Sequence, residues 1–194
     1  MDFIYRKLDV LSPQACQDFI NVFEASDLKR PGVLYGPEGL SAYEGKKSTD
    51  ITFNPTFLDH QVWGPLLRQV VEILDRGKRD YKTRYQTAFD NLDDFNLDAS
   101  INMQRYLPGE GFTSYHCERA GMSHSNRILV WMIYLNTVYD AGETEFYYQH
   151  HFEQAWEGKL MIWPSDWTYL HRGITSPSTS KYVLTGWFVH PQNS

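Results

Sequence analysis

The chain has 194 residues, of which 42% are hydrophobic, and a formal net charge of −6 at pH 7. This length predicts a single domain over residues 1–194. The sequence patterns described below divide it into helical support over about 1–94 and a β-rich core over about 95–190. The acidic balance argues against nucleic acid as a partner, because nucleic-acid binding normally requires a basic patch.

Membrane and secretion signals are missing from the sequence. The longest apolar run, Ile128 to Leu135, is far too short to span a bilayer. The N-terminal MDFIYRKLDV lacks the apolar segment of a secretion signal. Cys16 and Cys117 define neither a disulfide framework nor a metal ribbon. We therefore expect a cytoplasmic protein with no membrane partner.

The first half of the chain carries the helical signals. Ser12 followed by Pro13 predicts the start of an amphipathic helix over residues 13–25. A second helical period begins at Leu66 and can continue past Gly77 to Phe89. Residues 30–47 are rich in Gly, Pro and Tyr and have no period, so we expect a long loop there. Such a loop is either functional or a mobile surface connection, and both alternatives stay open.

From about residue 95 the sequence changes to short β-branched and aromatic runs separated by turn residues. Regularly spaced strands of this kind, with no long helix between them, predict an antiparallel jelly roll with the helices packed outside it. The predicted strands are ASINMQRYL, FTSYHCE, RILVWMIYL, TEFYY, KLMIW, TYLHR and KYVLTGWFV.

Two His-x-Glu pairs compete as metal ligands. On a strand, His116 and Glu118 would share one face, and His171 is the candidate third ligand. Two histidines and one carboxylate leave coordination positions open, as in non-haem Fe(II) oxygenases, whereas a structural zinc site is closed, usually by cysteine. Cys117 would point to the opposite face. His151-Phe152-Glu153 lies in a polar stretch that we interpret as surface residues at a strand end and turn.

The role of Lys181 depends on whether its strand face points into a pocket or toward solvent. On the strand KYVLTGWF it shares one face with Val183, Thr185 and Trp187. If this face points inward, the buried lysine requires an anionic ligand, because an unpaired buried charge is costly. If it points outward, Lys181 is a surface residue.

Four segments in order resemble the prolyl 4-hydroxylase-like Fe(II)/2-oxoglutarate-dependent oxygenases. They are RYLPGEGFTSYHCE, RILVWMIYLNTVYDAGETEF, GKLMIWPSDWTYLHRG and KYVLTGWF. The resemblance implies a double-stranded β-helix that binds Fe(II) through His116, Glu118 and His171. It also implies that Lys181 pairs with the distal carboxylate of 2-oxoglutarate, with Tyr106 and Thr185 as further contacts and Trp187 lining the pocket.

The activity that the resemblance implies is hydroxylation of an unactivated C–H with release of succinate and CO2. The substrate that it implies is peptidyl proline. Its cosubstrates are 2-oxoglutarate and O2, with ascorbate as reductant. Two departures are visible: the family usually has Asp where this chain has Glu118, and its GGxT turn stands here as Ala141-Gly142-Glu143-Thr144. Glu118 is expected to remain a ligand, with a shifted iron or weaker binding.

Substrate contacts are expected at the mouth of the pocket. Tyr35 and Tyr43, in the 30–47 loop, are candidate lid residues for a peptide, and Arg172 and Trp187 are further candidates. Trp167 is an alternative contact, but a core position suits it better. The competing interpretations are a hydroxylase of a free amino acid or small metabolite, a catalytically silent binding module, and a cupin-like metal enzyme. The last two do not require His171 and Lys181 together.

Overall fold

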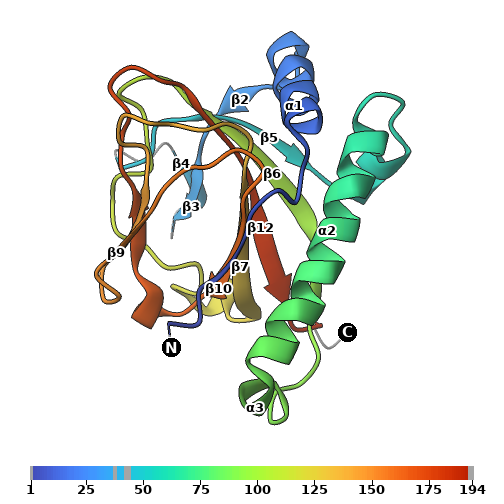
Figure 1. The fold of residues 1–194 in the computed structure, drawn as a ribbon, viewed down its shortest axis with the longest axis vertical. Helices are drawn as coiled ribbons and strands as arrows, with labels where there is room; N and C mark the ends of the chain where they lie inside the picture. Colours follow the sequence, from blue (N-terminus) through green and yellow to red (C-terminus); the bar gives the residue numbers. More distant parts are fainter. Residues whose placement is uncertain (1, 37–38, 42–44, 192–194) are drawn as a thin grey trace.

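The computed structural model describes residues 2–36, 39–41 and 45–191, which form two main antiparallel β-sheets and a two-stranded one, with helices outside them (Figure 1). The larger sheet has seven strands, in the spatial order β1 (Tyr5–Lys7), β10 (Leu160–Pro164), β7 (Arg127–Tyr134), β12 (Lys181–Val189), β6 (Asn96–Tyr106), β5 (Thr49–Phe53) and β2 (Arg30–Pro31). The smaller sheet has the order β11 (His171–Gly173), β8 (Thr144–Phe146) and β9 (His151–Glu153). The predicted jelly roll is confirmed.

The helices begin and end at clear local signals. Helix α1 spans Pro13–Ala25, and the Ser12 side chain caps it by accepting a hydrogen bond from the Ala15 N–H, which confirms the prediction. Helix α2 spans Trp63–Arg84. The predicted continuation to Phe89 is interrupted at Tyr85, and a separate short helix follows. The short helices are α3 (Gln86–Phe89), η1 (Pro55–Asp59), η2 (Met122–His124) and η3 (Trp167–Tyr169). No helix in the described ranges is both long and apolar enough to cross a membrane.

The main sheet separates two hydrophobic layers. Helices α1 and α2 cover its outer face (Figure 1), where Leu184 and Phe188 of β12 join apolar side chains from both helices. The opposite, inner face packs toward the smaller sheet, where Val183 contacts a second cluster that contains Phe146 and Trp163. Strand alternation therefore sends neighbouring residues of β12 into different layers. The inner layer contains the candidate site.

The N-terminal part supplies strands as well as helices. Strands β1, β2 and β5 extend the main sheet at both of its edges: β1 pairs with β10, β5 with β6, and β2 with β5. The segment 30–47 was expected to lack regular structure. Instead it contains β2 and a hairpin of β3 (Leu34–Gly36) and β4 (Gly39–Ser41), in which Gly36 lies opposite Gly39. These strands are too short to show a hydrophobic alternation in the sequence, so their pairing could not be predicted from it.

Two predicted strands differ from the structure. FTSYHCE is an extended segment with isolated bridges, Lys46↔Phe112 and His116↔His171, and not a regular strand. TYLHR begins with η3, and its strand is β11. The backbone of FTSYHCE bonds to residues 45–47 at one point and to His171 at another, so a continuous ladder with one partner strand cannot form.

Candidate active site

A pair of backbone hydrogen bonds brings His116 and His171 together. The N–H of each residue donates to the carbonyl of the other at 3.0 Å. His171 begins β11, and His116 lies in the extended segment that follows β6. Their ring centroids are 4.4 Å apart. The site is therefore built where the smaller sheet meets the segment that leaves the larger one.

Glu118 completes the cluster from a turn. Its backbone N–H donates to the Ser165 carbonyl at 3.1 Å, which anchors the turn to the end of β10. Its Oε1 atom lies 3.6 Å from His116 Nε2 and 3.9 Å from His171 Nε2. One candidate ligand atom from each residue lies within 4.8 Å of the others. Neighbouring ligand atoms that lie about 2.0–2.2 Å from one ion are about 3.0–3.5 Å apart, so small side-chain movements would bring these three atoms onto a metal.

Both imidazoles are oriented for metal binding. His116 Nδ1 lies 2.9 Å from the Ser114 carbonyl, and His171 Nδ1 lies 2.9 Å from the Tyr169 carbonyl. A carbonyl only accepts, so each Nδ1 carries the proton and each Nε2 has its lone pair free toward the cluster. Burial lowers the pKa of His116, and burial followed by repulsion from His116 lowers the pKa of His171 to about 4. Both rings are therefore neutral near pH 7.

The carboxylate of Glu118 is held in its charged form. Burial by itself raises the pKa of Glu118, but attraction to His116, His171 and Arg127, and a hydrogen bond from Trp187, outweigh burial and lower that pKa. A neutral imidazole pair beside a charged carboxylate is the donor set that Fe(II) takes in oxygenases, where the remaining positions stay open. The residues present fit this ion.

The cluster opens into a cavity of about 680 Å³ between the two sheets. Lys181, Val183, Thr185 and Trp187 all line it, which confirms that this face of β12 points inward. Aromatic and polar side chains from β6 and β10 form other parts of the wall, including Tyr106, Gln104, Asn102 and Trp163.

Lys181 is a buried cation in the cavity wall. Its side chain is buried, and Nζ donates to the Gly142 carbonyl at 3.0 Å. Burial lowers the pKa of Lys181 to about 8, although Glu143 attracts the charge. In the part of the chain that the structure describes, no carboxylate forms an ion pair with it. A buried ammonium whose hydrogen bond goes to a neutral carbonyl favours an anionic ligand in the cavity.

Tyr106 and Thr185 flank the lysine on the same face. Tyr106 lies opposite Lys181 in the β6–β12 pair, and the Lys181 Nζ atom is 5.4 Å from the Tyr106 ring centroid. The Tyr106 hydroxyl donates to Gln104 Oε1 at 2.7 Å. Thr185 donates to the Trp131 carbonyl at 2.8 Å, which leaves its oxygen free to accept. Both residues line the cavity that Lys181 also lines.

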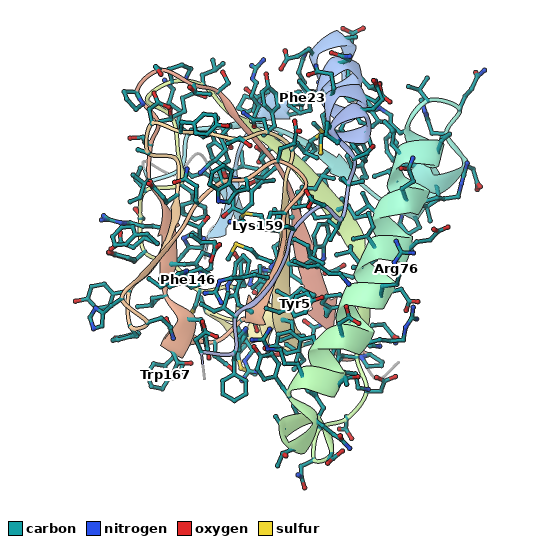
Figure 2. All side chains as sticks on the ribbon, in the orientation of Figure 1. Tyr5, Phe23, Arg76, Phe146, Lys159 and Trp167 are labelled. Atoms are coloured by element: carbon teal, nitrogen blue, oxygen red, sulfur yellow. The ribbon has the colours of Figure 1, made fainter. Side chains whose placement is uncertain are left out.

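The expected substrate residues have different positions. Trp187 and Arg172 line the cavity, and Arg172 is also paired with Glu145 at 2.7 Å. Trp167 is 68% exposed and projects outward (Figure 2), so the expected core position is wrong. It lies in η3, whose backbone turns outward before β11. The backbone of Tyr35 lies in β3, and Tyr43 lies outside the described residues.

The second His-x-Glu pair belongs to a buried ionic cluster. His151-Phe152-Glu153 forms β9 directly after a turn, and Phe152 is exposed as expected, but Glu153 is buried, so the expected surface position is wrong for Glu153. Glu153 accepts from Lys159 Nζ at 2.7 Å, from Arg6 Nε at 2.5 Å and from His151 Nε2 at 2.8 Å. The cations that neutralise it come from β1 and from the residue before β10, which sequence spacing did not indicate. Within the described ranges, only His116, Glu118 and His171 form a cluster suited to a metal.

Sequence reasoning missed two ion pairs of the cavity. Arg127 Nη1 lies 3.3 Å from Glu118 Oε2, and Lys46 Nζ lies 2.8 Å from Asp50 Oδ2. Arg127 directly precedes the apolar run of β7, and a charged residue there is normally interpreted as the polar end of a strand. Its partner in the turn at Glu118 becomes evident only when β7 lies beside that turn.

The comparisons with known proteins agree with this geometry. The model of the 2OG-Fe(II) oxygenase superfamily matches residues 101–189. The comparison with curated proteins gives no match. Among solved structures, a prolyl-4-hydroxylase from Pseudomonas putida is 18% identical over 98% of this chain and 94% of its own, with a TM-score of 0.72.

Two further structures show the same fold. The viral collagen prolyl hydroxylase from Paramecium Bursaria Chlorella virus-1 is 16% identical over 96% of both chains, with a TM-score of 0.69. A prolyl hydroxylase from Trichoplax adhaerens, in complex with a hypoxia inducible factor peptide fragment, is 13% identical over 97% of this chain and 84% of its own, with a TM-score of 0.76.

The superfamily match begins inside β6, at Ile101, and includes the triad and β12, which line the cavity. The match, the fold and the donor set support a 2-oxoglutarate/Fe(II)-dependent dioxygenase. In fold, the chain resembles prolyl hydroxylases.

Proposed function

We propose that His116, Glu118 and His171 bind Fe(II) and that Lys181 binds the distal carboxylate of 2-oxoglutarate. The observation that carries this proposal is the buried Lys181, which faces the cavity that the triad also lines. Tyr106 and Thr185 would contact the same cosubstrate. When bound, Fe(II), 2-oxoglutarate and O2 supply the oxidising chemistry that hydroxylates a C–H and releases succinate and CO2.

The charges of the cavity support this assignment. A dication, the Lys181 ammonium and the Arg127 guanidinium would face the Glu118 carboxylate and the two carboxylates of 2-oxoglutarate, so each negative charge of the loaded site would have a positive partner. Such pairing avoids most of the penalty for burying unpaired charges. The chain orients these groups through strand β12 and the His116–His171 bridge, both of which have backbone hydrogen bonds independent of any ligand.

We propose peptidyl proline as the hydroxylated group. The structural similarity to prolyl hydroxylases supports this choice, and one of those structures holds a peptide. Arg172 and Trp187, which line the cavity, would contact such a peptide, and Tyr35 and Tyr43 are further candidates that rest on the sequence alone. A free amino acid or small metabolite is the second candidate, because the polar side chains of Asp50, Asn102 and Gln104 line the same cavity.

The cellular setting is part of the same proposal. Cys16 and Cys117 are both free, and Cys16 is fully buried. Free thiols suit a reducing compartment, so we propose a cytoplasmic enzyme. Ascorbate would serve as its reductant. The net charge of −6 supports a partner other than nucleic acid or an anionic membrane surface.

The proposed metal site is tested by anaerobic titration of metal-free protein with Fe(II) and 2-oxoglutarate, with the visible charge-transfer absorption of the chelate as readout. Wild type should develop the band, and His171→Ala should not. Lys181→Ala should require about 100-fold more 2-oxoglutarate, because it removes the partner of a buried carboxylate. The control His151→Ala changes a histidine that the structure places outside the cavity, and it should retain the band. A folded wild type without a band would overturn the proposal.

The substrate is tested separately by succinate formation. Proline-containing peptides should accelerate it, and matched peptides with alanine in place of proline should not. Acceleration by free proline or another free amino acid, with no response to peptides, would favour the second candidate and exclude the first. The two outcomes differ in the substrate alone, because both require the same cosubstrate site.

A further inference from the structure

The two oxygen atoms of Glu118 have different surroundings. Oε1 faces the two imidazole Nε2 atoms, at 3.6 Å and 3.9 Å. Oε2 points the other way and accepts a hydrogen bond from Trp187 Nε1 at 2.9 Å and another from Arg127 Nη1 at 3.3 Å. One oxygen is thus free for a metal, while the protein holds the other.

The two donors are held by neighbouring strands. Trp187 lies on the inner face of β12 and Arg127 begins β7, which pairs with β12 through Phe188↔Leu129. The Arg127 guanidinium carbon lies 3.5 Å from the centroid of the Trp187 ring, which is close enough for a cation–π contact. Arg127 Nη1 also donates to the Glu118 carbonyl at 3.2 Å. Arginine, indole and glutamate therefore form one connected group, and Trp187 cannot tilt without disturbing both partners.

The backbone at residue 118 is held independently. The N–H groups of Glu118 and Arg119 both donate to the Ser165 carbonyl, at 3.1 Å and 3.0 Å. The reach of the side chain therefore decides where the carboxylate lies. An aspartate at this position would place its carboxylate about 1.5 Å closer to the backbone, which is one carbon–carbon bond. It could not accept from Trp187 at hydrogen-bond distance and also meet the two imidazoles.

We propose that Trp187, supported by Arg127, is a positioning residue that makes this metal site require glutamate at position 118. The inference rests on the proposed metal-binding role of the triad, and it reverses the expectation that the longer side chain weakens the site. The indole N–H holds Oε2, so that Oε1 alone faces the metal. Hydrogen bonds of this kind to a metal-binding carboxylate typically strengthen metal affinity by about 10- to 100-fold.

The test measures Mn(II) affinity from the electron paramagnetic resonance signal of the free ion, without cosubstrate and without turnover. Trp187→Phe keeps an aromatic ring beneath Arg127 and removes the indole donor together with part of the ring volume. It should raise the Kd for Mn(II) by about 10-fold or more, and Glu118→Asp should do the same. In the Glu118→Asp background, Trp187→Phe should change the Kd less than about twofold, because the hydrogen bond is already lost.

Trp131→Phe is the matched control. Trp131 lies on the outer face of the same sheet, fully buried, and its indole nitrogen has no hydrogen-bond partner. This substitution should leave the Kd for Mn(II) unchanged. Additive effects of Trp187→Phe and Glu118→Asp would show that Trp187 acts through general packing and would overturn the inference. Mn(II) binding by Glu118→Asp as tight as by wild type would overturn it as well. A wild type that binds no Mn(II) would overturn the metal site itself, and the inference with it.

Discussion

At the scale of single residues, the environment of a side chain decides its chemistry. Lys181 is an ordinary lysine in the sequence, but its place on the inner face of β12 lowers its pKa to about 8 through burial. Without a bound anion, the lysine is thus still mostly protonated at pH 7 but loses its proton as the pH rises through about 8. A bound carboxylate would stabilise the charged form and raise this pKa again.

This predicts a pH dependence of 2-oxoglutarate binding. The anion requires the protonated lysine, so affinity should be constant below the lysine pKa of about 8. Above that pH it should fall, by about tenfold for each further unit. Isothermal titration between pH 7 and 9 with Mn(II)-loaded protein measures this. The control is Lys181→Arg, whose guanidinium stays charged over this range, so its affinity should vary much less. Identical profiles for the two proteins would contradict the assignment of Lys181.

At the scale of elements, strand β12 determines both layers of the molecule. The prediction for KYVLTGWFV agrees with β12 at both ends, because alternation and β-branched content are strong there. FTSYHCE was predicted as a strand for similar reasons, but it has only isolated bridges. His116 and Glu118 still meet His171, because the bridge and the Ser165 contacts replace a continuous ladder.

Gly186 is the position where β12 tolerates no side chain. A Cβ atom there would lie 2.7 Å from Trp131 Cζ2, on the neighbouring strand β7. Gly186→Ala should therefore lower the free energy of unfolding by about 1–3 kcal/mol, because a fully buried indole cannot easily move. Urea denaturation measures the change. Gly121→Ala is the control, since nothing lies within 4 Å of its added Cβ, and it should stay within about 0.5 kcal/mol of wild type. Equal free energies of unfolding for the two variants would contradict a clash between a Cβ at residue 186 and Trp131.

At the scale of the whole molecule, a buried ionic cluster joins the N-terminal strand to both sheets. Glu153 of β9 binds Arg6 of β1 and Lys159, which precedes β10. Lys159 is 1% exposed and lies near the centre of Figure 2. Burial raises the pKa of Glu153, but its hydrogen bonds from Lys159, Arg6 and His151 outweigh burial and lower that pKa. The cluster holds β1 in place, although the strand has only three residues.

Glu153→Gln should destabilise the fold by about 3–5 kcal/mol, because it leaves Lys159 as an uncompensated buried charge. Glu153→Gln with Lys159→Met should recover part of the loss. The folded-state pKa of Glu153 lies below the unfolded value, so its contribution is present above the unfolded pKa and is lost as pH falls through the folded one. The difference between wild type and Glu153→Gln should therefore shrink in acid.

Urea denaturation at several pH values checks this prediction. Asp75→Asn is the control, because the Asp75–Arg79 pair is exposed, with side-chain exposures of 60% and 62%. An exposed pair contributes little, so this variant should stay within about 0.5 kcal/mol of wild type. A loss in Glu153→Gln no larger than in Asp75→Asn would contradict the structural role of the cluster.

The sequence by itself determined the jelly roll, helix α1, strand β12 and the grouping of His116, Glu118 and His171. The helix, the strand and the jelly roll follow from local periods and turn signals, which act over a few residues. The grouping of the three ligands followed from the ordered motifs that resemble the oxygenase family. Only the tertiary structure decided that Trp167 is exposed, that Glu153 is buried and that Trp187 and Arg127 hold Glu118. Those contacts join residues far apart in the chain, and their energies depend on burial and on which strands become neighbours.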